Sequence, residues 1–511
     1  MICLCLTGAS LDEWTRQIDN HRPHVSLVEL RVDLLRPAER SVEAIRAWRE
    51  EFLRQLPIIL TVRRPRDFGR WEGDDGQRLY LLTRLVDALK PEYLDLELDR
   101  QSGVDWVQLA RRQEEYGGRV VRSYHGTVAD RQELAQLMAR LATSPREIPK
   151  LALDAQSLAD TTMLFSAARE FARRMSGREA VWLAMNEYGL SSRVAPSHFG
   201  SVWTYTSDLS SATGPAAPGQ LDPASAKQIY RPDQATSDWP LFGVLGSPVA
   251  HSRSPEYHNR RFAEAGCEAV YLPVRAETFA EFIDFAETVD LRGVSVTVPH
   301  KIAALELVQH EDQGGATERA ARIGAVNTLW RDEKNRWYGD NTDVDGFLVP
   351  LEEAVGANGA GRHAAVIGAG GAARAVVVGL VDAGWTVDIY NRTPRRAQDL
   401  IDSLDFSSTE SHGMEELREL APGTLDLLVQ TTPVGMDHGP AGDPAEGYRF
   451  SGTETVYDLI YAPRETALLA RARAAGCRTI NGDRMFAAQA EAQFVIFRSL
   501  LERGSQRRKS T

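Results

Sequence analysis

Residues 146–155 read REIPKLALDA, and they place Lys150 between a proline and an apolar run that is typical of a buried strand. A buried ammonium group is costly to desolvate, so it either pairs with a carboxylate or loses its proton. The alternative is a lysine at the mouth of a strand with its ammonium group in water, as most lysines lie. The neighbouring strands decide between these two interpretations.

Similar apolar runs recur through the first part of the chain, and most are separated by helix-like segments. With 148–155 they make eight: 2–8, 25–33, 57–63, 92–99, 118–126, 180–186 and 200–207 are the others. Segments such as 41–56 and 161–175 carry apolar residues three and four positions apart, as an amphipathic helix does. Strands that alternate with helices in this way predict a closed parallel (β/α)8 barrel, the TIM-barrel fold, over residues 1–222.

The composition narrows the classes of partner. The chain has 511 residues and a formal net charge of -12 at pH 7, which gives no broad attraction for nucleic acid or an anionic membrane. We therefore expect small-molecule partners, and the oligomeric state stays open. Cys3, Cys5, Cys267 and Cys477 are too few and too scattered for a disulfide framework or a zinc site, so we expect no metal. The opening MICLCLTGAS lacks a basic segment and a sustained apolar one, which predicts a cytoplasmic protein.

Charged residues recur within the otherwise apolar runs of the predicted barrel. Successive side chains of a strand alternate between its faces, so ELRVD and DLELD each put three charged residues on one face. The full set is Glu29, Arg31, Asp33, Arg63, Asp95, Glu97, Asp99, His125 and Lys150. So many charges do not fit a solvated face, and chemistry in such barrels lies at the C-terminal ends of the strands. We predict a polar site there.

A lysine beside a histidine has a specific chemical use. A desolvated lysine with a lowered pKa can attack a ketone and form a Schiff base, whose iminium accepts electrons. A histidine that titrates near neutral pH can then remove the proton on the adjacent carbon. A class I aldolase and a β-elimination enzyme both work in this way, and the two residues alone do not choose between them.

The motifs ELRVD, YLDLELD, SYHGT, IPKLA, SSRV and APGQ, in this order, resemble type I 3-dehydroquinate dehydratase over roughly residues 1–222. The resemblance implies that Lys150 forms the iminium with the substrate ketone and that His125 is the general acid/base for loss of water. It also implies that the substrate carboxylate and hydroxyls are held by Glu29, Arg31, Arg63, Arg193 and Gln220. Guanidinium groups suit this task because they bind carboxylates through two hydrogen bonds.

A polar segment at 223–239, which we interpret as a linker with one short helix, leads to a new domain that opens with LFGVLGSPVAHSRSP. Later, residues 364–393 read as a strand, a glycine turn, a helix and a second strand, the beginning of a Rossmann-type dinucleotide-binding unit. Gly368, Gly370 and Gly371 let the backbone approach a pyrophosphate. The second strand ends in NRTPRR, where Arg392 and Arg396, one helical turn apart, suit the 2′-phosphate of NADP; an acidic residue would instead suit NAD.

The hydroxyl- and amide-rich motifs GSPVAHSRSPEYHN, VSVTVPHK, IGAVNT and GDNTDVDG fit turns or a polyol-binding surface. Together with TTPVGM, YDLIYAP and MFAAQAEAQF they resemble shikimate dehydrogenase from about residue 240 to 503. The resemblance implies a shikimate-binding domain at 240–345, completed by a helix at 484–503, and an NADP-binding domain at 346–483. Lys301 and Asp343 would be the catalytic pair.

The same resemblance implies the binding residues of this half. The implied substrate contacts are Ser252, Ser254, Thr297, Asn327, Tyr461 and Gln489. The implied cofactor contacts are Gly368, Ala369, Gly370, Gly371, Ala372, Asn391, Arg392, Thr393, Arg396, Thr432, Leu459 and Gly482.

Several residues depart from the two family patterns. In the first half Asp67 begins the segment where a Glu-Gly-Gly is usual, and Ala216 replaces a lid serine. In the second half Ser295, Gln430 and Arg484 replace two asparagines and a glycine.

The two families catalyse consecutive steps, since 3-dehydroshikimate is the product of the first and the substrate of the second. We therefore expect a bifunctional enzyme of the shikimate pathway. Two alternatives stay open: the second half uses NAD on quinate-like acids, or one half is a non-catalytic regulatory module.

Overall fold

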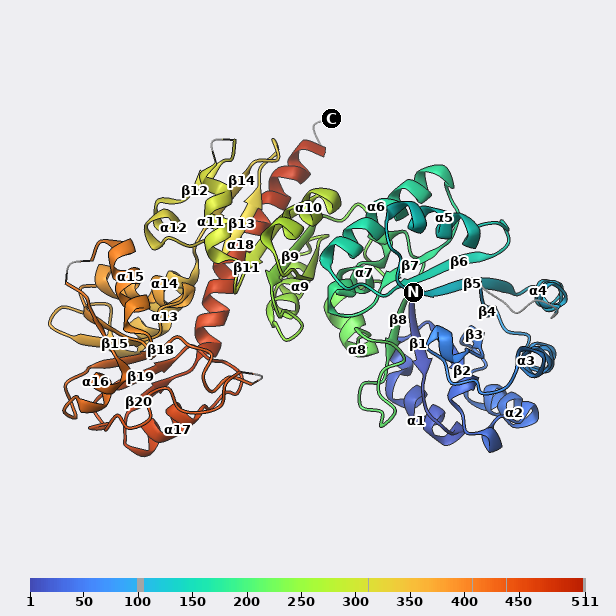
Figure 1. Cartoon of the computed structure of the whole chain (residues 1–511), viewed down its shortest axis with the longest axis horizontal. Coiled ribbons are helices and arrows are strands. Elements are labelled where there is room, and N and C mark those ends of the chain that lie inside the picture. The colour runs from blue at the N-terminus through green and yellow to red at the C-terminus, as the bar shows by residue number, and fades with distance from the viewer. Residues whose placement is uncertain (99–104, 311, 407, 438, 509–511) are drawn as a thin grey trace. The chain divides into compact units, whose positions relative to one another are not determined.

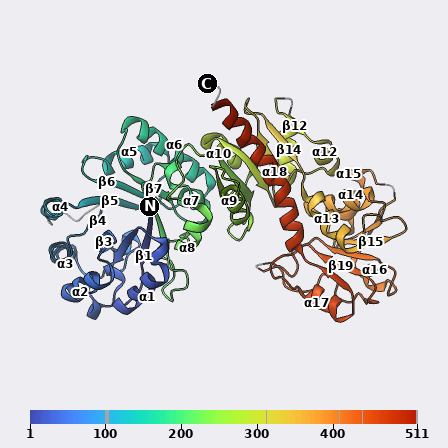
Figure 2. The same cartoon turned by 180° about the vertical axis from the view of Figure 1, so that it is seen from behind.

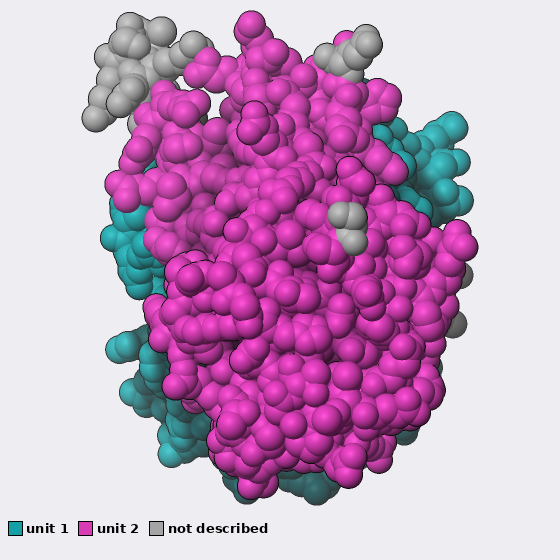
Figure 3. Space-filling view, turned by 90° about the vertical axis from the view of Figure 1, so that its left-hand side faces the viewer, with its two compact units in different colours: residues 1–291 teal, residues 292–511 magenta. Residues whose placement is uncertain are grey.

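The computed structural model describes residues 1–98, 105–310, 312–406, 408–437 and 439–508 (Figure 1). By its internal contacts the chain divides into two compact units, Met1–Leu291 and Arg292–Thr511, which Figure 3 shows in separate colours. Each unit is described by itself below.

The first unit begins with eight parallel strands in the order β7-β6-β5-β4-β3-β2-β1-β8. Their bounds are β1 Ile2–Leu6, β2 Leu27–Arg31, β3 Ile58–Thr61, β4 Tyr93–Glu97, β5 Arg119–Gly126, β6 Ile148–Leu153, β7 Val181–Ala184 and β8 Thr204–Ser207. A parallel bridge between Ala180 and Ser201 joins the two remaining edges. The predicted (β/α)8 barrel is confirmed, and each predicted run contains one of its strands.

Helices surround these strands, as Figure 1 and Figure 2 show from opposite sides. They are α1 Leu11–His21, α2 Val42–Phe52, α3 Asp75–Leu89, α4 Trp106–Glu115, α5 Arg131–Leu141, α6 Leu158–Arg174 and the short α7 Leu190–Val194. Capping residues set where they begin: Ser157 and Asp160 form a reciprocal capping box before α6, which satisfies amide groups that the helix leaves without partners.

The alternation of side chains along the strands separates the helix-facing core from the barrel interior. Leu30 of β2 and Leu94 of β4 belong to the apolar cluster that includes the helices α1 to α4. Ile148 and Ala152 of β6 belong to a second cluster with Cys3 and Cys5. Lys150 lies midway between Ile148 and Ala152 and therefore faces the barrel interior.

The rest of the first unit follows the barrel. A short helix at Pro223–Ser225 continues as a helical segment at Ala226–Tyr230, inside the predicted linker. The elements β9 Leu241–Gly246, α9 Ser254–Glu264, β10 Val270–Arg275 and α10 Phe279–Val289 complete the unit. Strands β9 and β10 pair in parallel, and α10 packs against α6 of the barrel.

The second unit contains a mixed sheet and a parallel one. In the first, β13 Thr328–Arg331 lies between β11 Leu291–Val296 and β14 Trp337–Asp340, and β14 also pairs with β12 Gly315–Ala316. The parallel sheet has the order β17-β16-β15-β18-β19-β20. Its strands are β15 His363–Ile367, β16 Thr386–Tyr390, β17 Glu410–His412, β18 Leu427–Gln430, β19 Thr455–Asp458 and β20 Arg478–Ile480. This strand order is the doubly wound Rossmann arrangement that the glycine turn predicted.

The helices of the second unit are α11 Lys301–Gln309, α12 Glu318–Ile323, α13 Asp343–Val355, α14 Gly371–Asp382, α15 Pro394–Leu404, α16 Met414–Glu419, α17 Ala467–Ala474 and α18 Gly482–Arg508. The last of these packs along α13. The domain boundaries expected at residues 222, 239, 345 and 483 stay predictions.

Candidate active sites

One cavity inside the barrel brings together every residue that the sequence assigned to the first site. Glu29, Arg31, Arg63, His125, Lys150, Arg193 and Gln220 all line it, with Ala152, Leu183, Met185, Tyr205, Ala216 and Ala217. It encloses about 330 Å³ of empty space, including space open to the surrounding water. These side chains come from five strands, from α7 and from the segments that follow β3, β7 and β8, so only closure of the barrel brings them together.

Lys150 is buried, and its ammonium group has carboxylate partners. Its Nζ donates to Oδ2 of Asp95 at 2.8 Å and lies 4.0 Å from Oε1 of Glu29. It also lies 4.3 Å from the centre of the Tyr205 ring, close enough for a cation–π contact. The interpretation of a lysine with its head in water at a strand mouth is therefore wrong.

Both carboxylates beside Lys150 are held in the ionised form. Burial on its own raises the pKa of Asp95, but the charges of Lys150 and Arg63 outweigh burial and leave that pKa below its ordinary value. Glu29 behaves in the same way: burial opposes ionisation, and Lys150, Arg63 and Arg31 lower its pKa. Two acids and two bases thus form a charge-balanced cluster, in which Arg63 donates to both Glu29 and Asp95.

His125 is buried and neutral. Burial lowers its pKa well below 6.5, and the positive charges of Arg63 and Lys150 lower it further. Its Nδ1 is buried and has no hydrogen-bond partner among the described residues. A neutral imidazole with an unpaired ring nitrogen in this cavity is suited to accept a proton.

Arg193 provides a positive charge that no described carboxylate neutralises. Its Nη2 donates to the carbonyl of Pro218 at 3.0 Å, while its Nε and Nη1 are buried without partners. Burial lowers its pKa to about 10, so it stays protonated at neutral pH. Arg31 differs, because it already forms two hydrogen bonds with Asp33, at 3.0 and 2.8 Å.

Two details of the barrel differ from expectation or lie outside the described residues. β2 ends at Arg31, so Asp33 does not share its strand face as predicted; the chain turns after Arg31, and Asp33 caps its guanidinium. Asp99 lies outside the described residues.

Two residues of the barrel that depart from the family pattern have partners. Asp67 pairs with Arg64. The backbone of Ala216 donates to Ser207, which also donates to Gln220.

In the second unit Lys301 and Asp343 form the expected pair. Each is the first residue of a helix, α11 and α13, and Lys301 Nζ lies 2.5 Å from Asp343 Oδ2. The other oxygen of Asp343 accepts a hydrogen bond from Asn327 at 2.8 Å. Asn327 was expected to contact substrate, and in this structure it orients the carboxylate.

The glycine turn has the features of a nucleotide site. Gly368 has φ +114°, and a Cβ there would lie 2.5 Å from Thr431 Oγ1, so only glycine fits. Gly370 precedes α14 without a side-chain cap, which leaves helix amide groups available for a phosphate. A Cβ on Gly371 would lie 3.3 Å from Cδ of Lys301, so the turn lies beside that lysine. Ala369 and Ala372 are on either side of its last two glycines.

The segment that follows β16 carries the expected ribose contacts. Arg392, Thr393 and Arg396 are exposed, and Asn391 donates from its side chain to the carbonyl of Thr393. Because α15 begins at Pro394, Arg392 precedes the helix, and the helical-turn spacing assumed for the two arginines is wrong. They lie on either side of the helix start.

Tight backbone packing surrounds the remaining cofactor positions. Gln430 accepts from the amide of Thr432 and donates to its hydroxyl, so this departure from the family pattern supports the turn after β18. A Cβ on Gly482 would lie 2.0 Å from the carbonyl oxygen of Leu459. Only glycine therefore allows this close approach at the start of α18.

The first unit holds the serines expected to bind the second substrate's carboxylate. Ser254 begins α9, and its amide donates to Ser252 Oγ at 3.3 Å. The preceding loop is fixed by Glu187, which follows β7: one carboxylate oxygen accepts from the amides of Val249 and Ala250, both at 2.8 Å. The other oxygen accepts from Arg275 at 2.7 Å.

The other expected substrate residues lie in the second unit. Thr297 follows β11, and Gln489 lies on α18, where its Cβ packs against Gly346 of α13. The ring of Tyr461 lies 5.5 Å from that of Phe486. Arg484 pairs with Glu353 on an exposed surface.

Sequence reasoning missed four residues that shape these sites: Asp95 as the partner of Lys150, Tyr205, Gln493 and Glu187. Asp95 stood on the charged face of DLELD, and that face was the available signal. Gln493 accepts from Ser295 at 2.6 Å and donates to Thr328 at 3.1 Å; its partners come from other elements, which one sequence does not pair.

Comparison with family models agrees with this geometry. Residues 2–237 match the model for type I 3-dehydroquinase, and residues 244–329 match the substrate-binding domain of shikimate dehydrogenase. Residues 351–433 match the model for shikimate / quinate 5-dehydrogenase.

A relative that spans both halves decides the family. The bifunctional 3-dehydroquinate dehydratase/shikimate dehydrogenase of Arabidopsis thaliana is 30% identical over 520 residues, which cover 98% of this chain and 82% of the relative. The chain belongs to the family of bifunctional 3-dehydroquinate dehydratase/shikimate dehydrogenases.

Two further matches cover one half and nearly the whole of the chain, respectively. The NADP(+)-dependent shikimate dehydrogenase of Oleidesulfovibrio alaskensis is 41% identical over 271 residues, covering 50% of this chain and 89% of the relative. A solved structure of the dehydroquinate dehydratase and shikimate dehydrogenase portion of the S. pombe protein AroM covers 98% of this chain and 97% of that one, with 22% identity and a TM-score of 0.40. Among the described residues we find no helix with the length and apolar character that a membrane crossing requires.

Proposed function

We propose that Lys150 and His125 carry the dehydratase reaction of this bifunctional enzyme. The observation that carries the proposal is a buried lysine, paired with Asp95 and lining one cavity with a neutral histidine. Arg193 binds the substrate carboxylate, because it is the buried cation of the cavity that has no described carboxylate partner. Glu29, Arg63 and Gln220 contact the hydroxyl groups.

The reaction follows from these assignments. Lys150 transfers a proton to His125, and its free amine adds to the ketone of 3-dehydroquinate. The ketone oxygen leaves as water with one proton from the amine and the proton returned by His125, so that the iminium forms and His125 is neutral again. His125 then removes the proton on the carbon next to the iminium. The hydroxyl on the following carbon leaves, and it takes that proton from His125 to depart as water. Hydrolysis of the iminium releases 3-dehydroshikimate and restores Lys150.

We further propose that Lys301 and Asp343 carry the reduction to shikimate. When NADPH is bound, it supplies the hydride to the ketone carbon. Lys301 donates a proton to the oxygen that becomes the hydroxyl, and Asp343, oriented by Asn327, holds the Lys301 side chain in position. Ser252 and Ser254 bind the carboxylate, and Thr297, Tyr461 and Gln489 contact the ring substituents.

NADP is the proposed cofactor. The uncapped start of α14 and the close packing at Gly368 suit a pyrophosphate. Arg392 and Arg396, exposed at the start of α15, suit a 2′-phosphate. The match to relatives named NADP(+)-dependent supports the same choice.

Steady-state assays of the whole chain with 3-dehydroquinate, and with shikimate plus NADP or NAD, test both activities. Borohydride added with 3-dehydroquinate should leave a covalent adduct on the peptide that contains Lys150. An unmodified Lys150 under turnover contradicts the barrel mechanism. A preference for quinate and NAD would favour the alternative in which the second half uses NAD on quinate-like acids. Absence of one activity would favour the alternative in which one half is a non-catalytic regulatory module. The intact Lys150/His125 and Lys301/Asp343 pairs oppose that second alternative.

The cytoplasmic localisation and the absence of a nucleic-acid partner stay predictions from composition. The Arabidopsis relative is named chloroplastic. Fractionation of cells that produce the full-length protein tests the localisation.

A further inference from the structure

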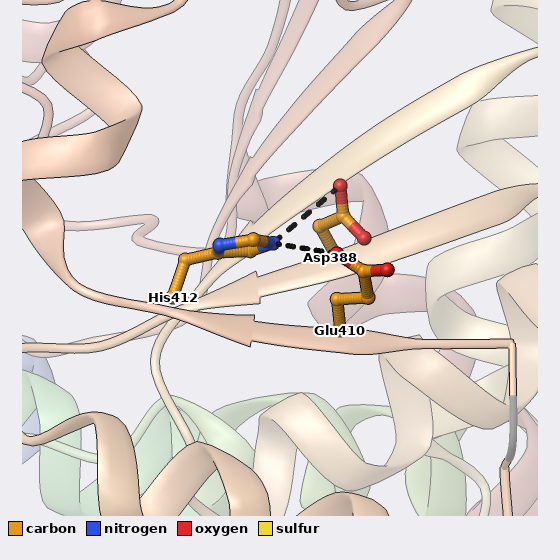
Figure 4. Close-up of side chains that lie close together, drawn as sticks. All are labelled: Asp388, Glu410 and His412. Atoms are coloured by element: carbon orange, nitrogen blue, oxygen red, sulfur yellow. Dashed lines mark ion pairs between the residues drawn. The ribbon is translucent and has the colours of Figure 1, made fainter.

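The edge of the parallel sheet in the second unit carries a polar cluster that neither reaction uses. The cluster consists of Asp388 on β16 and of Glu410 and His412 on β17 (Figure 4). One carboxylate oxygen of each acid and one ring nitrogen of the histidine all lie within 4.8 Å of one another. His363 of β15 contacts the same aspartate, with 2.8 Å between Nε2 and Oδ2. Imidazole and carboxylate groups together are the ligands that zinc and similar ions take.

The strand register places two negative charges directly opposite each other. Asp388 and Glu410 are partners across the parallel pair β16–β17. Like charges at opposed positions destabilise a sheet unless a positive charge lies between them. The third member, His412, is two residues after Glu410 and shares its face.

The orientation of His412 indicates what that positive charge is. Its Nδ1 lies 2.8 Å from Oε2 of Glu416 on α16, and a carboxylate only accepts, so Nδ1 carries the proton. Its Nε2 faces Asp388 and Glu410 at 4.0 and 3.7 Å, which is too long for hydrogen bonds. Two metal–ligand bonds of about 2.0–2.2 Å each span such a gap.

The residues around the cluster also resemble those that hold the ligands of a metal site in position. A carboxylate on the far nitrogen of a histidine fixes its tautomer and makes it a better ligand, as Glu416 does here. The His412 ring stacks on Tyr390 at 5.1 Å, and His363 holds Asp388. His412 and Asp388 are therefore held in position before an ion arrives.

We propose that Asp388, Glu410 and His412 bind one divalent transition-metal ion of the zinc class, with water completing its coordination. The ion joins β17, the edge strand, to β16 and stabilises this edge of the sheet. No motif in the sequence indicates such a site, because its ligands come from two strands that are separated by α15.

Calorimetric titration of the chelator-treated, full-length protein with zinc chloride tests the site. We expect about one equivalent to bind, with affinity reduced at least about tenfold in Glu410→Gln and in His412→Ala, and by about ten- to hundredfold in the supporting variant Glu416→Gln. The matched controls Glu419→Gln and His310→Ala, at exposed positions, should bind as the unmodified protein does. Magnesium should not compete, because it prefers oxygen ligands alone.

Two results would overturn the proposal. One is no zinc binding by the unmodified protein. The other is equal binding by the unmodified protein and by Glu410→Gln. Circular dichroism and both enzyme activities of each variant, measured alongside, separate loss of the ion from loss of the fold.

Discussion

The two halves of the chain use the same pair of residue types, lysine and aspartate, in different settings. Lys150 on β6 and Asp95 on β4 face each other across the intervening strand β5, with 3% and 1% of their side chains exposed. Lys301 and Asp343 begin two helices, and 15% and 9% of their side chains are exposed. In the proposed roles, a lysine that adds to a ketone needs a free amine, which burial favours, whereas one that passes a proton in every turnover needs a route to solvent. The setting, more than the pair, distinguishes the two reactions.

Removal of Lys150 is the sharpest test of this comparison. Lys150→Ala should lower dehydratase kcat/KM by at least about 10⁴-fold, since the covalent route needs the amine. Dehydrogenase activity of the same protein should stay within twofold (roughly 0.4 kcal/mol) of normal. Lys334→Ala, at an exposed position, is the control and should change neither rate.

Lys301→Ala should have the reciprocal effect. We expect dehydrogenase kcat to fall by about 10²- to 10⁴-fold, the range for loss of a general acid, with little change in the affinity for NADP. Stopped-flow or steady-state rates and NADP titration by fluorescence provide the measurements. If dehydratase activity fell as well, the two lysines would not act independently.

The next prediction tests whether the second reaction uses NADP or NAD. Hydrogen bonds to charged groups contribute about 1.5 to 3 kcal/mol each, but exposure of both arginines favours the low end. The double variant Arg392→Ala, Arg396→Ala should therefore raise the Michaelis constant for NADP by about 10²-fold and hardly affect NAD. An unmodified protein that already prefers NAD contradicts this and favours the quinate-type alternative. Arg395→Ala, on the same helix, is the matched control.

The pH dependence of the dehydratase reaction tests whether His125 is buried away from water in the barrel. Burial lowers the pKa of His125 well below 6.5, so the neutral, proton-accepting form persists when the pH falls through 6.5. Dehydratase kcat/KM should therefore hold its value at pH 6.5 and decline only at lower pH. A profile of kcat/KM against pH measures this for the free enzyme. A decline centred at pH 6.5 would indicate a histidine in ordinary contact with water.

The smallest expected effect concerns Glu187, which follows a barrel strand yet fixes the loop before Ser252. Glu187→Ala should raise the Michaelis constant for shikimate by about tenfold, equivalent to 1.4 kcal/mol, and change kcat less than twofold (roughly 0.4 kcal/mol). Glu187→Gln keeps an acceptor for the two amides and should restore much of the affinity. Glu287→Ala on the exposed side of α10 is the control. Equal loss in kcat and in affinity would instead indicate a general disruption of the loop.

Much of the fold and of the first site followed from the sequence because local patterns determine them. Short apolar runs, separated by segments with apolar residues three and four positions apart, predicted the eight strands at the places where they lie. The charged positions on their inner faces identified Lys150, His125 and Arg63. The glycine turn likewise predicted the parallel sheet of the second unit, since only glycine allows the backbone conformation at Gly368.

What sequence did not provide were the partners of these residues. Asp95 pairs with Lys150 because both side chains point into the interior of the closed barrel from β4 and β6. Asn327 orients Asp343 because the residue before β13 lies beside the start of α13. Arg31 is committed to Asp33 by a turn after β2, and Asp388 faces Glu410 through the register of two strands. The sequence by itself determined which residue types are available for the two reactions and which segments of the chain contain them. Only the tertiary structure decided which charges are buried, which are neutralised and which stay unpaired, because desolvation and pairing depend on distances between segments remote in the chain.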